Sequence, residues 1–398
     1  MAEGKRKLFA TQTGPERVFL VGVASKASTD GWSAADSLEE LAYLARTANA
    51  AVVGELVQRL DAPSPAHYIG RGKLGELRSL REQVRYDTVV FDDDLSPRQQ
   101  RNLEEALEVK VIDRTALILD IFARHARTRE GQLQVELAQH QYLLLRLVGQ
   151  WGHLERLGGG IGTRGPGESQ LETDRRLINK RISRLEREIA EVRRHRDLYR
   201  KRRRERGVPV VALVGYTNAG KSTLFNTLGK ASMVVEDALF STLDPVTRRF
   251  ALPGGQQFLI TDTVGFIHKL PTLLIAAFRA TLEELGEASL LLHVVDIMHK
   301  NAVHQCRTVE EMLKGLHLEG KSRLTVFNKL DLALNSEAEL ESLSLSPRIP
   351  LLEQQVMLPG ENIALISAAK GWGVGKLLEK VISLLNISGD SGKRSPAS

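Results

Sequence analysis

One stretch near the middle of the chain constrains its fold more than any other. Residues 215–222 read Gly-Tyr-Thr-Asn-Ala-Gly-Lys-Ser and match the pattern G-x-x-x-x-G-K-[ST], which cradles phosphate groups. The apolar run 210–214 before it is typical of a buried strand, and residues 222–228 are typical of the start of a helix. This order of strand, glycine-rich turn and helix predicts a P-loop in an α/β domain with a parallel sheet.

The residue types in this loop suit an anion. Glycine accepts backbone conformations that other residues avoid, so the loop can wrap closely around a phosphate with its N–H groups turned inward. The N-terminus of the next helix adds partial positive charge. We expect Lys221 to reach the outer phosphates and the hydroxyl of Ser222 to bind Mg²⁺. The alternative is an ordinary glycine-rich turn between a strand and a helix.

Two motifs further along the chain weigh against an ordinary turn. Asp262-Thr-Val-Gly265 follows an apolar run; its carboxylate can hold Mg²⁺ through a water molecule, and the Gly265 N–H can face a γ-phosphate. Asn328-Lys-Leu-Asp331 follows a second apolar run. The Asp331 carboxylate can accept hydrogen bonds from the N1–H and the 2-amino group of guanine, a pair of donors that adenine lacks. This motif therefore selects GTP.

A fourth motif completes the set. Ser367-Ala-Ala369 follows the apolar run 363–366 and can give a backbone N–H to the guanine O6. Taken singly, each of these later motifs also fits a polar turn after a strand. The four motifs come in order, each at the carboxyl end of a predicted strand, where open α/β sheets bind ligands. Together they predict a GTP-binding domain.

Three more stretches carry a resemblance to a known family. They are Phe240-Ser-Thr-Leu-Asp-Pro245, Asp262-Thr-Val-Gly-Phe266 and, upstream, Gly159-Gly-Ile-Gly-Thr-Arg-Gly-Pro-Gly-Glu-Ser-Gln-Leu-Glu-Thr-Asp-Arg-Arg176, which generic GTPases lack. With the P-loop, these stretches resemble the HflX family of translational GTPases, and the resemblance covers nearly the whole chain. By the family pattern, Thr242 is expected to be the switch I threonine that binds Mg²⁺ in the GTP state, with Thr247 as the competing candidate.

The motifs and the resemblance together define the expected site. The expected catalytic residues are Lys221, Thr242 and Gly265, and the expected Mg²⁺ ligands are Ser222 and Thr242. The residues expected to bind the nucleotide are Gly215, Tyr216, Thr217, Asn218, Ala219, Gly220, Lys221, Ser222, Thr223, Phe240, Ser241, Thr242, Leu243, Asp244, Asp262, Thr263, Val264, Gly265, Asn328, Lys329, Leu330, Asp331, Ser367, Ala368 and Ala369. The expected reaction is hydrolysis of GTP to GDP and phosphate by in-line attack of water.

One part of the expected catalytic machinery is missing. Many GTPases place a glutamine directly after D-x-x-G to orient the attacking water, whereas this chain has Phe266, whose side chain cannot form hydrogen bonds. We therefore expect slow intrinsic turnover that a partner raises by supplying or ordering a group. The alternative is that a side chain elsewhere in the fold orients the water.

The chain before the GTP-binding motifs falls into two regions. From Arg17 to about Phe122, apolar strands alternate with amphipathic helices, an order that predicts a second parallel sheet. Within it, residues 68–73 could bind an anion and the acidic triplet 92–94 a metal, but a plain turn and a solvated turn are the favoured interpretations. We expect an N-terminal α/β domain at 1–122, a helical hairpin at 123–206, a P-loop G domain at 207–387 and a disordered tail at 388–398.

Leucine and isoleucine recur in the helical region at spacings of mostly three and four, which predicts a coiled-coil seam. The seam positions are Leu133, Leu137, Leu144, Leu147, Leu171, Ile178, Ile182, Leu185, Ile189 and Val192. A glycine-rich loop, residues 152–167, separates the two helical stretches, so an antiparallel hairpin is the simplest arrangement. Trp151, Arg156 and Arg164 suit contact with RNA at this loop, and a long mobile linker is the alternative.

The charge of the chain favours a polyanionic partner. The formal net charge is +6, and residues 193–206 concentrate arginine densely enough to bind phosphates with release of counterions, although such a run is often only a solvated face. No apolar run reaches the 18 residues of a membrane-spanning helix, and the single cysteine, Cys306, suits the cytosol. We expect a cytoplasmic monomer without a membrane span, and a loose association with membranes stays open.

The resemblance implies a partner and a role. The partner is the ribosome, chiefly its large subunit and the rRNA, together with GTP and GDP. The implied role is to split stalled or idle ribosomes in the GTP form, with hydrolysis permitting release. Two other functions stay open: a timer of large-subunit assembly, and an ATP-dependent RNA remodeller that the G domain regulates.

Overall fold

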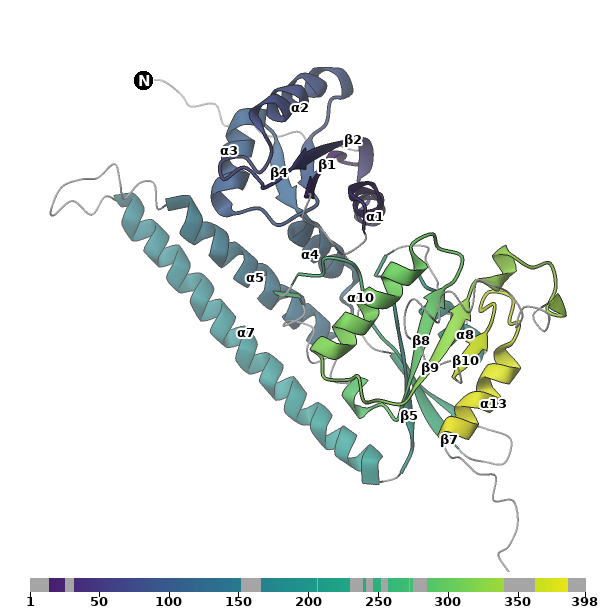
Figure 1. The fold of residues 1–398 in the computed structure, drawn as a ribbon. Coiled ribbons are helices and arrows are strands. Elements are labelled where there is room, and N and C mark those ends of the chain that lie inside the picture. Colours follow the sequence, from purple (N-terminus) through teal and green to yellow (C-terminus); the bar gives the residue numbers. More distant parts are fainter. Residues whose placement is uncertain are drawn as a thin grey trace, which may run out of the picture. The chain divides into compact units, whose positions relative to one another are not determined.

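The computed structural model of the chain describes residues 14–25, 32–151, 166–205, 207–229, 239–240, 246–251, 257–271, 273–274, 285–339 and 362–385. The chain forms two compact units: residues 1–121 with 145–161, and residues 122–144 with 162–398. Each unit contains one β-sheet whose strands are mostly or wholly parallel (Figure 1).

A four-stranded sheet in the order β2-β1-β3-β4 forms the centre of the first unit, and every neighbouring pair is parallel. The strands are β1 (Arg17–Ser25), β2 (Ala51–Leu60), β3 (Thr88–Phe91) and β4 (Lys110–Asp113). All four residues of β3 are buried, as expected for a central strand covered on both faces. The α/β fold predicted for this region is therefore confirmed.

The helices of this unit are α1 (Ala34–Thr47), α2 (Arg71–Val84), α3 (Pro97–Leu107) and α4 (Arg114–His125), of which α4 runs on into the second unit. Two of these helices, α1 and α3, begin at a capping serine, Ser33 and Ser96. Ser96 and Gln99 form a capping box at the start of α3, and Pro97 occupies the first turn, where a missing N–H does no harm. Phe19 of β1, Leu77 of α2 and Leu103 of α3 share one buried cluster between sheet and helices.

The acidic triplet after β3 differs from the solvated turn that the sequence favours. Asp92 is 2% exposed, whereas Asp94 is exposed. The Asp92 carboxylate accepts a hydrogen bond from the Ser37 hydroxyl at 2.6 Å and pairs with the Arg114 guanidinium at 2.8 Å. Arg114 also pairs with Glu40. Burial of a carboxylate requires such partners, so Asp92 is a buried structural ion and that interpretation is wrong for it.

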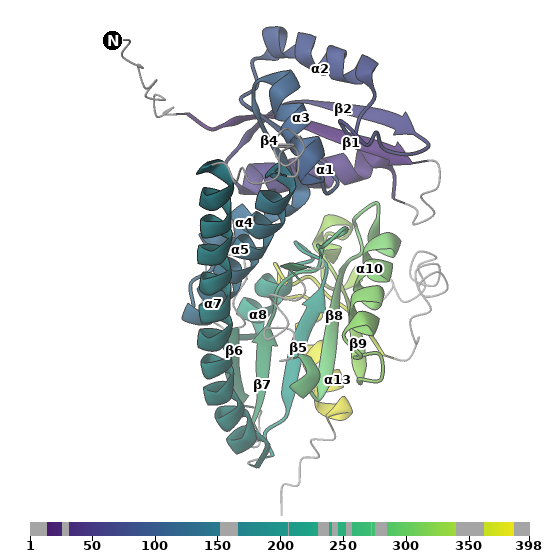
Figure 2. The same ribbon diagram turned by 90° about the vertical axis from the view of Figure 1, so that its left-hand side faces the viewer.

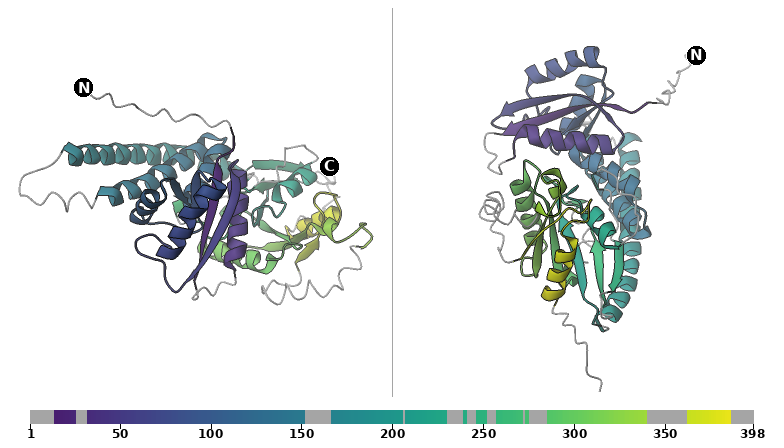
Figure 3. Two further views of the ribbon diagram at one scale, coloured as in Figure 1. Left: turned by 90° about the horizontal axis from the view of Figure 1, so that it is seen from above. Right: turned by 90° about the vertical axis from the view of Figure 1, so that its right-hand side faces the viewer.

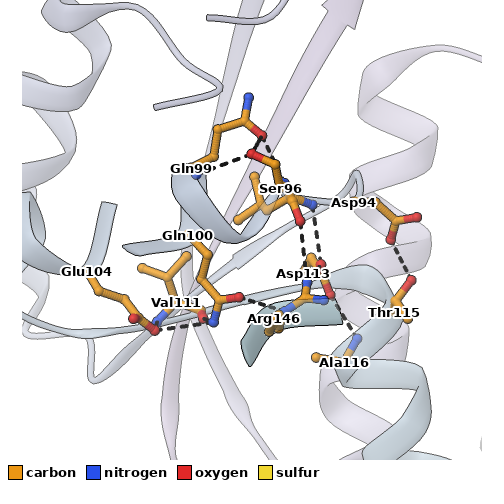
Figure 4. A network of polar contacts seen from close by, with 11 residues as sticks. Asp94, Ser96, Gln99, Gln100, Glu104, Val111, Asp113, Thr115, Ala116 and Arg146 are labelled. Atoms are coloured by element: carbon orange, nitrogen blue, oxygen red, sulfur yellow. Dashed lines mark hydrogen bonds and ion pairs between the residues drawn. The ribbon is translucent and has the colours of Figure 1, made fainter. Parts of the chain in front are cut away.

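A second buried carboxylate ends β4 (Figure 4). Asp113 is 1% exposed, accepts the backbone N–H of Ala116 at 2.9 Å and pairs with Arg146. Arg146 also donates to the side chain of Gln100 at 2.8 Å. These contacts fix the last turns of α5 to the first unit, to which residues 145–151 belong.

Two long helices pair side by side as an antiparallel hairpin (Figure 1). They are α5 (Arg129–Trp151) and α7 (Pro166–Glu205). Leu133 of α5 packs in a buried cluster with Leu185 and Ile189 of α7. Glu130 pairs with Arg196, whereas Glu136, six residues later, pairs with Arg181, so the two helices run in opposite directions. The predicted hairpin and its seam are confirmed over these contacts, while the loop residues Arg156 and Arg164 lie outside the described part of the chain.

The second unit holds a six-stranded sheet in the order β10-β9-β8-β5-β7-β6, and most of this order can be followed in Figure 2. The strands are β5 (Val210–Gly215), β6 (Val246–Ala251), β7 (Gln257–Asp262), β8 (Leu290–Asp296), β9 (Arg323–Asn328) and β10 (Ile363–Leu365). Only the edge strand β6 is antiparallel to its neighbour, β7. The chain leaves β5 toward β7 and later returns to β8 on the other side of β5, which makes the carboxyl end of β5 the topological switch point.

Helices cover both faces of this sheet. They are α8 (Lys221–Gly229), α10 (Ala302–Gly315) and α13 (Val374–Leu384), with a short 3₁₀ turn η1 (Leu330–Leu332). Phe225 of α8 and Leu377 of α13 belong to one buried cluster with the inner strands, whereas Cys306 of α10 packs on Phe327 in a separate cluster. Figure 3 shows α13, in yellow, beside the strands of its unit. This doubly wound arrangement confirms the predicted P-loop GTPase fold.

Candidate active site

Two glycines let the P-loop pass close to neighbouring strands. A Cβ atom on Gly215, the last residue of β5, would lie 2.2 Å from the carbonyl oxygen of Val294 in β8. Gly220 has φ of +92°, and a Cβ there would lie 2.2 Å from the side-chain nitrogen of Asn328. Only glycine fits both positions, so the loop closes tightly around the end of β5 before α8 begins at Lys221.

Lys221 places a buried cation at the centre of this loop. Its ammonium group donates to the carbonyl oxygens of Gly215 at 3.1 Å and Tyr216 at 2.7 Å. Within the described residues, no carboxylate lies within 4.0 Å of it. Burial lowers the pKa of Lys221 from 10.5 to about 8, and the more distant Asp262 opposes this shift. A phosphate group would supply the missing negative charge, so the donor set fits an anionic ligand.

Ser222 and Asp262 lie together beside the P-loop. The Ser222 hydroxyl donates to the Asp262 carboxylate at 2.7 Å, and Asp262 ends β7 with only 1% of its surface exposed. A hydroxyl and a carboxylate at this distance are hard oxygen ligands of the kind that Mg²⁺ prefers. P-loop GTPases generally use Mg²⁺ with GTP, and the residues here fit the ion.

The D-x-x-G motif and the residue after it pack against the P-loop. A Cβ on Gly265 would lie 2.7 Å from the Cα of Thr217 and 3.0 Å from the Lys221 nitrogen, so a larger residue does not fit. The Phe266 N–H donates to the Gly215 carbonyl at 3.1 Å, and its own carbonyl accepts the Thr217 N–H at 2.7 Å. The ring of Phe266 is 1% exposed. It is packed into the protein, in keeping with a position that supplies no group to orient water.

The predicted base-binding motifs are joined by Asn328. Its side-chain oxygen accepts the N–H of Ala368, and its nitrogen donates to the carbonyl of Ala219, each at 2.9 Å. Asn328 thus connects the P-loop with the last motif. The Ser367 hydroxyl donates to the Asp331 carboxylate at 2.6 Å, which orients the group that we expect to read guanine.

Sequence reasoning missed a residue of this region, Asp296. Its carboxylate lies 2.8 Å from the ammonium nitrogen of Lys329, whose backbone has φ of +66°. Asp296 is the last residue of β8, and a carboxylate at the carboxyl end of a predicted central strand was the available signal. The ion pair fixes the Lys329 side chain beside Asn328 and Asp331.

The other predicted residues are placed as follows. Tyr216, Thr217, Ala219, Thr263, Val264, Leu330 and Ala368 are buried, Gly220 and Thr223 are half-buried, and Asn218 and Ala369 are exposed. Phe240 is buried, and Ser241, Thr242, Leu243 and Asp244 lie outside the described residues. Thr247, the competitor of Thr242, lies within β6, and its hydroxyl is 2.9 Å from that of Thr261 in the paired strand β7. That contact gives Thr247 a role in the ladder between β6 and β7.

Known proteins resemble this chain over most of its length. A GTPase HflX from Caldanaerobacter subterraneus subsp. tengcongensis is 51% identical over 317 residues, which cover 80% of this chain and 73% of the relative. The chain belongs to the HflX family of GTPases. Other HflX relatives include that of Magnetococcus marinus, 44% identical over 94% of this chain and 83% of its own length, and that of Escherichia coli, 42% identical over 88% and 79%.

Three family models match successive parts of this HflX chain. Residues 35–123 match the model described as GTP-binding GTPase N-terminal, and residues 125–203 match GTP-binding GTPase Middle Region. Residues 210–329 match 50S ribosome-binding GTPase. The chain is thus an HflX GTPase, an enzyme that hydrolyses GTP. No helix in the described part of the chain combines the length and the apolar character that a membrane span requires.

Proposed function

We propose that this HflX GTPase binds the large ribosomal subunit and splits stalled or idle ribosomes in its GTP form, with hydrolysis permitting release. The match of residues 210–329 to the 50S ribosome-binding GTPase model carries this proposal. The buried, uncompensated charge of Lys221 supports a site that is completed by nucleotide phosphates.

The residues near the P-loop define the proposed roles. Lys221 and the loop N–H groups hold the phosphates, and the Gly265 N–H faces the γ-phosphate. Ser222 and Thr242 bind Mg²⁺, with Asp262 acting through water, and the ion would neutralise charge on the phosphates. Asp331, held by Ser367, reads guanine. Because Phe266 supplies no group to orient water, intrinsic turnover is slow and the ribosome raises it.

A basic stripe on α7 supports an RNA partner. Arg176, Lys180, Arg187 and Arg194 are exposed, and their spacings of four, seven and seven residues place them on one side of the helix, opposite the seam at Leu185. With a rise of about 1.5 Å per residue, the stripe is about 27 Å long. Glu191 lies at its edge. A row of separated cations of this length suits the backbone phosphates of rRNA.

The main test combines two measurements on the same samples. GTP hydrolysis is followed without addition, with isolated large subunits and with whole ribosomes, while light scattering reports subunit dissociation. We expect strong stimulation by both particles and splitting that requires GTP. Stimulation without splitting would favour the assembly timer, and no stimulation by either particle would remove the ribosome as partner.

The stripe has its own matched control. Replacing Arg176, Arg187 and Arg194 by Gln should weaken binding to large subunits and reduce the slope of log affinity against log salt by about two to three. Replacing Arg46, Arg78 and Arg98, which are exposed in the first unit, removes the same charge. Equal losses from both sets would show that only net charge matters and would contradict a role for the stripe.

A further inference from the structure

Phe240 is held in place from two sides. Its backbone N–H donates to the hydroxyl oxygen of Thr217 in the P-loop at 3.1 Å. Its ring packs edge-on against Phe122, with ring centroids 4.6 Å apart and an interplanar angle of 75°. Phe240 is 2% exposed and Phe122 is fully buried. All three residues belong to the second unit, so the contacts lie within one compact body.

The backbone of Phe240 shows that these contacts hold it against a local preference. Its φ of +59° lies in the left-handed region, which a bulky residue without tertiary support rarely adopts. Such a conformation persists only where the surroundings fix it, and it is often found at functional sites. Here the surroundings are the Thr217 hydroxyl on the backbone side and the Phe122 ring on the side-chain side.

Thr217 is itself fixed to the parts of the site that face the γ-phosphate. Its N–H donates to the carbonyl of Phe266 at 2.7 Å, and its Cα and Cβ pack against Gly265. It is 6% exposed. These contacts fix the Thr217 hydroxyl relative to the D-x-x-G motif. Because Phe240 donates its N–H to that hydroxyl, its backbone is fixed relative to the motif as well.

We propose that Thr217 and Phe122 are positioning residues for GTP hydrolysis that act through Phe240. Thr217 joins Phe240 to Gly265, whose N–H we expect to face the γ-phosphate. Fixing Phe240 therefore helps to hold Thr217 and Gly265 in place. GDP has no γ-phosphate for Gly265 to contact, so the two residues affect the rate of hydrolysis and leave GDP affinity unchanged. The inference rests on the GTPase activity and not on the ribosome.

The test for Thr217 separates its hydroxyl from its shape. Thr217→Val keeps the shape and removes the acceptor, and we expect it to lower the single-turnover rate of GTP hydrolysis about tenfold, since the lost hydrogen bond acts on the rate alone. The Kd for GDP should change less than about twofold. Thr217→Ser, which keeps the acceptor, should restore most of the rate. Thr308→Val removes a comparable hydroxyl in α10 and should leave the rate unchanged.

The test for Phe122 uses a buried aromatic residue elsewhere as its control. Phe122→Leu should lower the rate about fivefold with little change in GDP affinity, because edge-on aromatic contact is lost while apolar bulk remains. Phe91→Leu removes a fully buried ring of β3 that packs on Tyr68 in the first unit, and it should leave the rate unchanged. A fall in GDP affinity that parallels the fall in rate would mean general damage to the G domain and would overturn the proposal.

The double variant Thr217→Val/Phe122→Leu decides whether both residues act through Phe240. If they do, the combined loss stays near tenfold, because the first substitution already releases Phe240, whereas independent effects would multiply to about fiftyfold. A multiplied loss would overturn the shared path. An unchanged rate in Thr217→Val, or a Thr217→Ser variant as slow as Thr217→Val, would overturn the role of the hydroxyl.

Discussion

Both sheets have buried charged side chains at or just beyond the carboxyl ends of their strands, but these charges are neutralised in different ways. In the first unit, Asp92 and Asp113 are buried carboxylates, and arginines of the same unit neutralise both. In the second unit, Lys221 is a buried cation whose hydrogen bonds go to neutral carbonyl groups. The first arrangement is complete in itself, whereas the second is completed by a ligand of opposite charge. The two sheets therefore differ in whether the chain itself supplies the counter-charge of a buried ion.

The largest effect should follow from removing the uncompensated charge. Lys221→Met should lower GTP hydrolysis by about 10²- to 10³-fold, since a group that stabilises phosphate charge is lost. The thermal unfolding midpoint of the nucleotide-free protein should stay equal or rise, because a desolvated cation is replaced by an apolar side chain of similar length. Circular dichroism measures the midpoint. A clear drop in it would mean that Lys221 is part of the structure's own charge balance and would break the comparison.

The opposite result is expected for the compensated charge. Arg114→Met should destabilise the protein by about 3–5 kcal/mol, because it leaves the Asp92 carboxylate buried without its counter-ion. Urea unfolding measures the free energy, and Arg46→Met, at an exposed site, should change it by less than about 0.5 kcal/mol. GDP affinity under native conditions should change little. If stability were unaffected and GDP binding were lost, the carboxyl edge of the first sheet would have to belong to the nucleotide site.

His293 extends the comparison to acid stability. It lies in β8 and is 1% exposed; its Nδ1 atom has no hydrogen-bond partner in the described part of the chain, and Glu310 lies 3.9 Å away. Burial, with smaller contributions from Arg323 and Lys221, lowers the pKa of His293 from 6.5 to about 3. The unfolded chain therefore binds a proton between those pH values and the folded chain does not, so stability falls as pH drops below 6.5.

The expected loss from His293 is about 2 kcal/mol between pH 7 and pH 5. His293→Gln should remove that part of the pH dependence, as measured by urea unfolding at both pH values. His195, on α7 in the same unit and exposed, provides the control, and His195→Gln should leave the dependence as it is. If His293→Gln lost as much stability between pH 7 and pH 5 as the wild type, the buried His293 side chain would not be the source of the acid sensitivity.

The smallest effect concerns the pH dependence of nucleotide binding. Because the pKa of Lys221 is about 8 in the nucleotide-free protein and phosphates raise it, binding takes up a proton above that pH. GDP affinity should therefore fall about fourfold between pH 7.0 and pH 8.5, a window below the titration of guanine itself. Titration calorimetry in two buffers of different ionisation heat reports the proton uptake directly. Binding without proton uptake at pH 8.5 would show that Lys221 is fully charged before the ligand arrives.

Much of the fold and the site could be predicted from local pattern. The P-loop, D-x-x-G and N-K-x-D motifs are short stretches whose chemistry is carried by neighbouring residues, and the seam of the hairpin is a repeat along each of two helices. The structure brings Lys221, Asp262 and Asn328 together, as the position of each motif after a strand predicts. These features depend on local sequence and on one topological rule.

The remaining features depend on contacts between distant residues. In the sequence, Asp92 is part of an acidic triplet that suits a solvated turn. The structure places Arg114 and Ser37 beside it, and no spacing in the sequence predicts these contacts. The link from Thr217 through Phe240 to Phe122 joins positions that are 23 and 118 residues apart. The hydrogen bonds that join Asn328 to Ala219 and Ala368 could not be predicted either, because its motif indicates contact with the nucleotide and not with these residues.

Hydrogen–deuterium exchange with and without GDP and Mg²⁺ tests the comparison of the two sheets most directly. We expect protection in the nucleotide-binding segments of the second unit, residues 215–223, 262–265, 328–331 and 367–369. Exchange should not change at residues 92–95 and 113–116, which contain the neutralised carboxylates of the first unit. ATP at the same concentration should protect none of the second-sheet segments. Protection by GDP at residues 92–95 or 113–116, or its absence from the P-loop, would contradict the account.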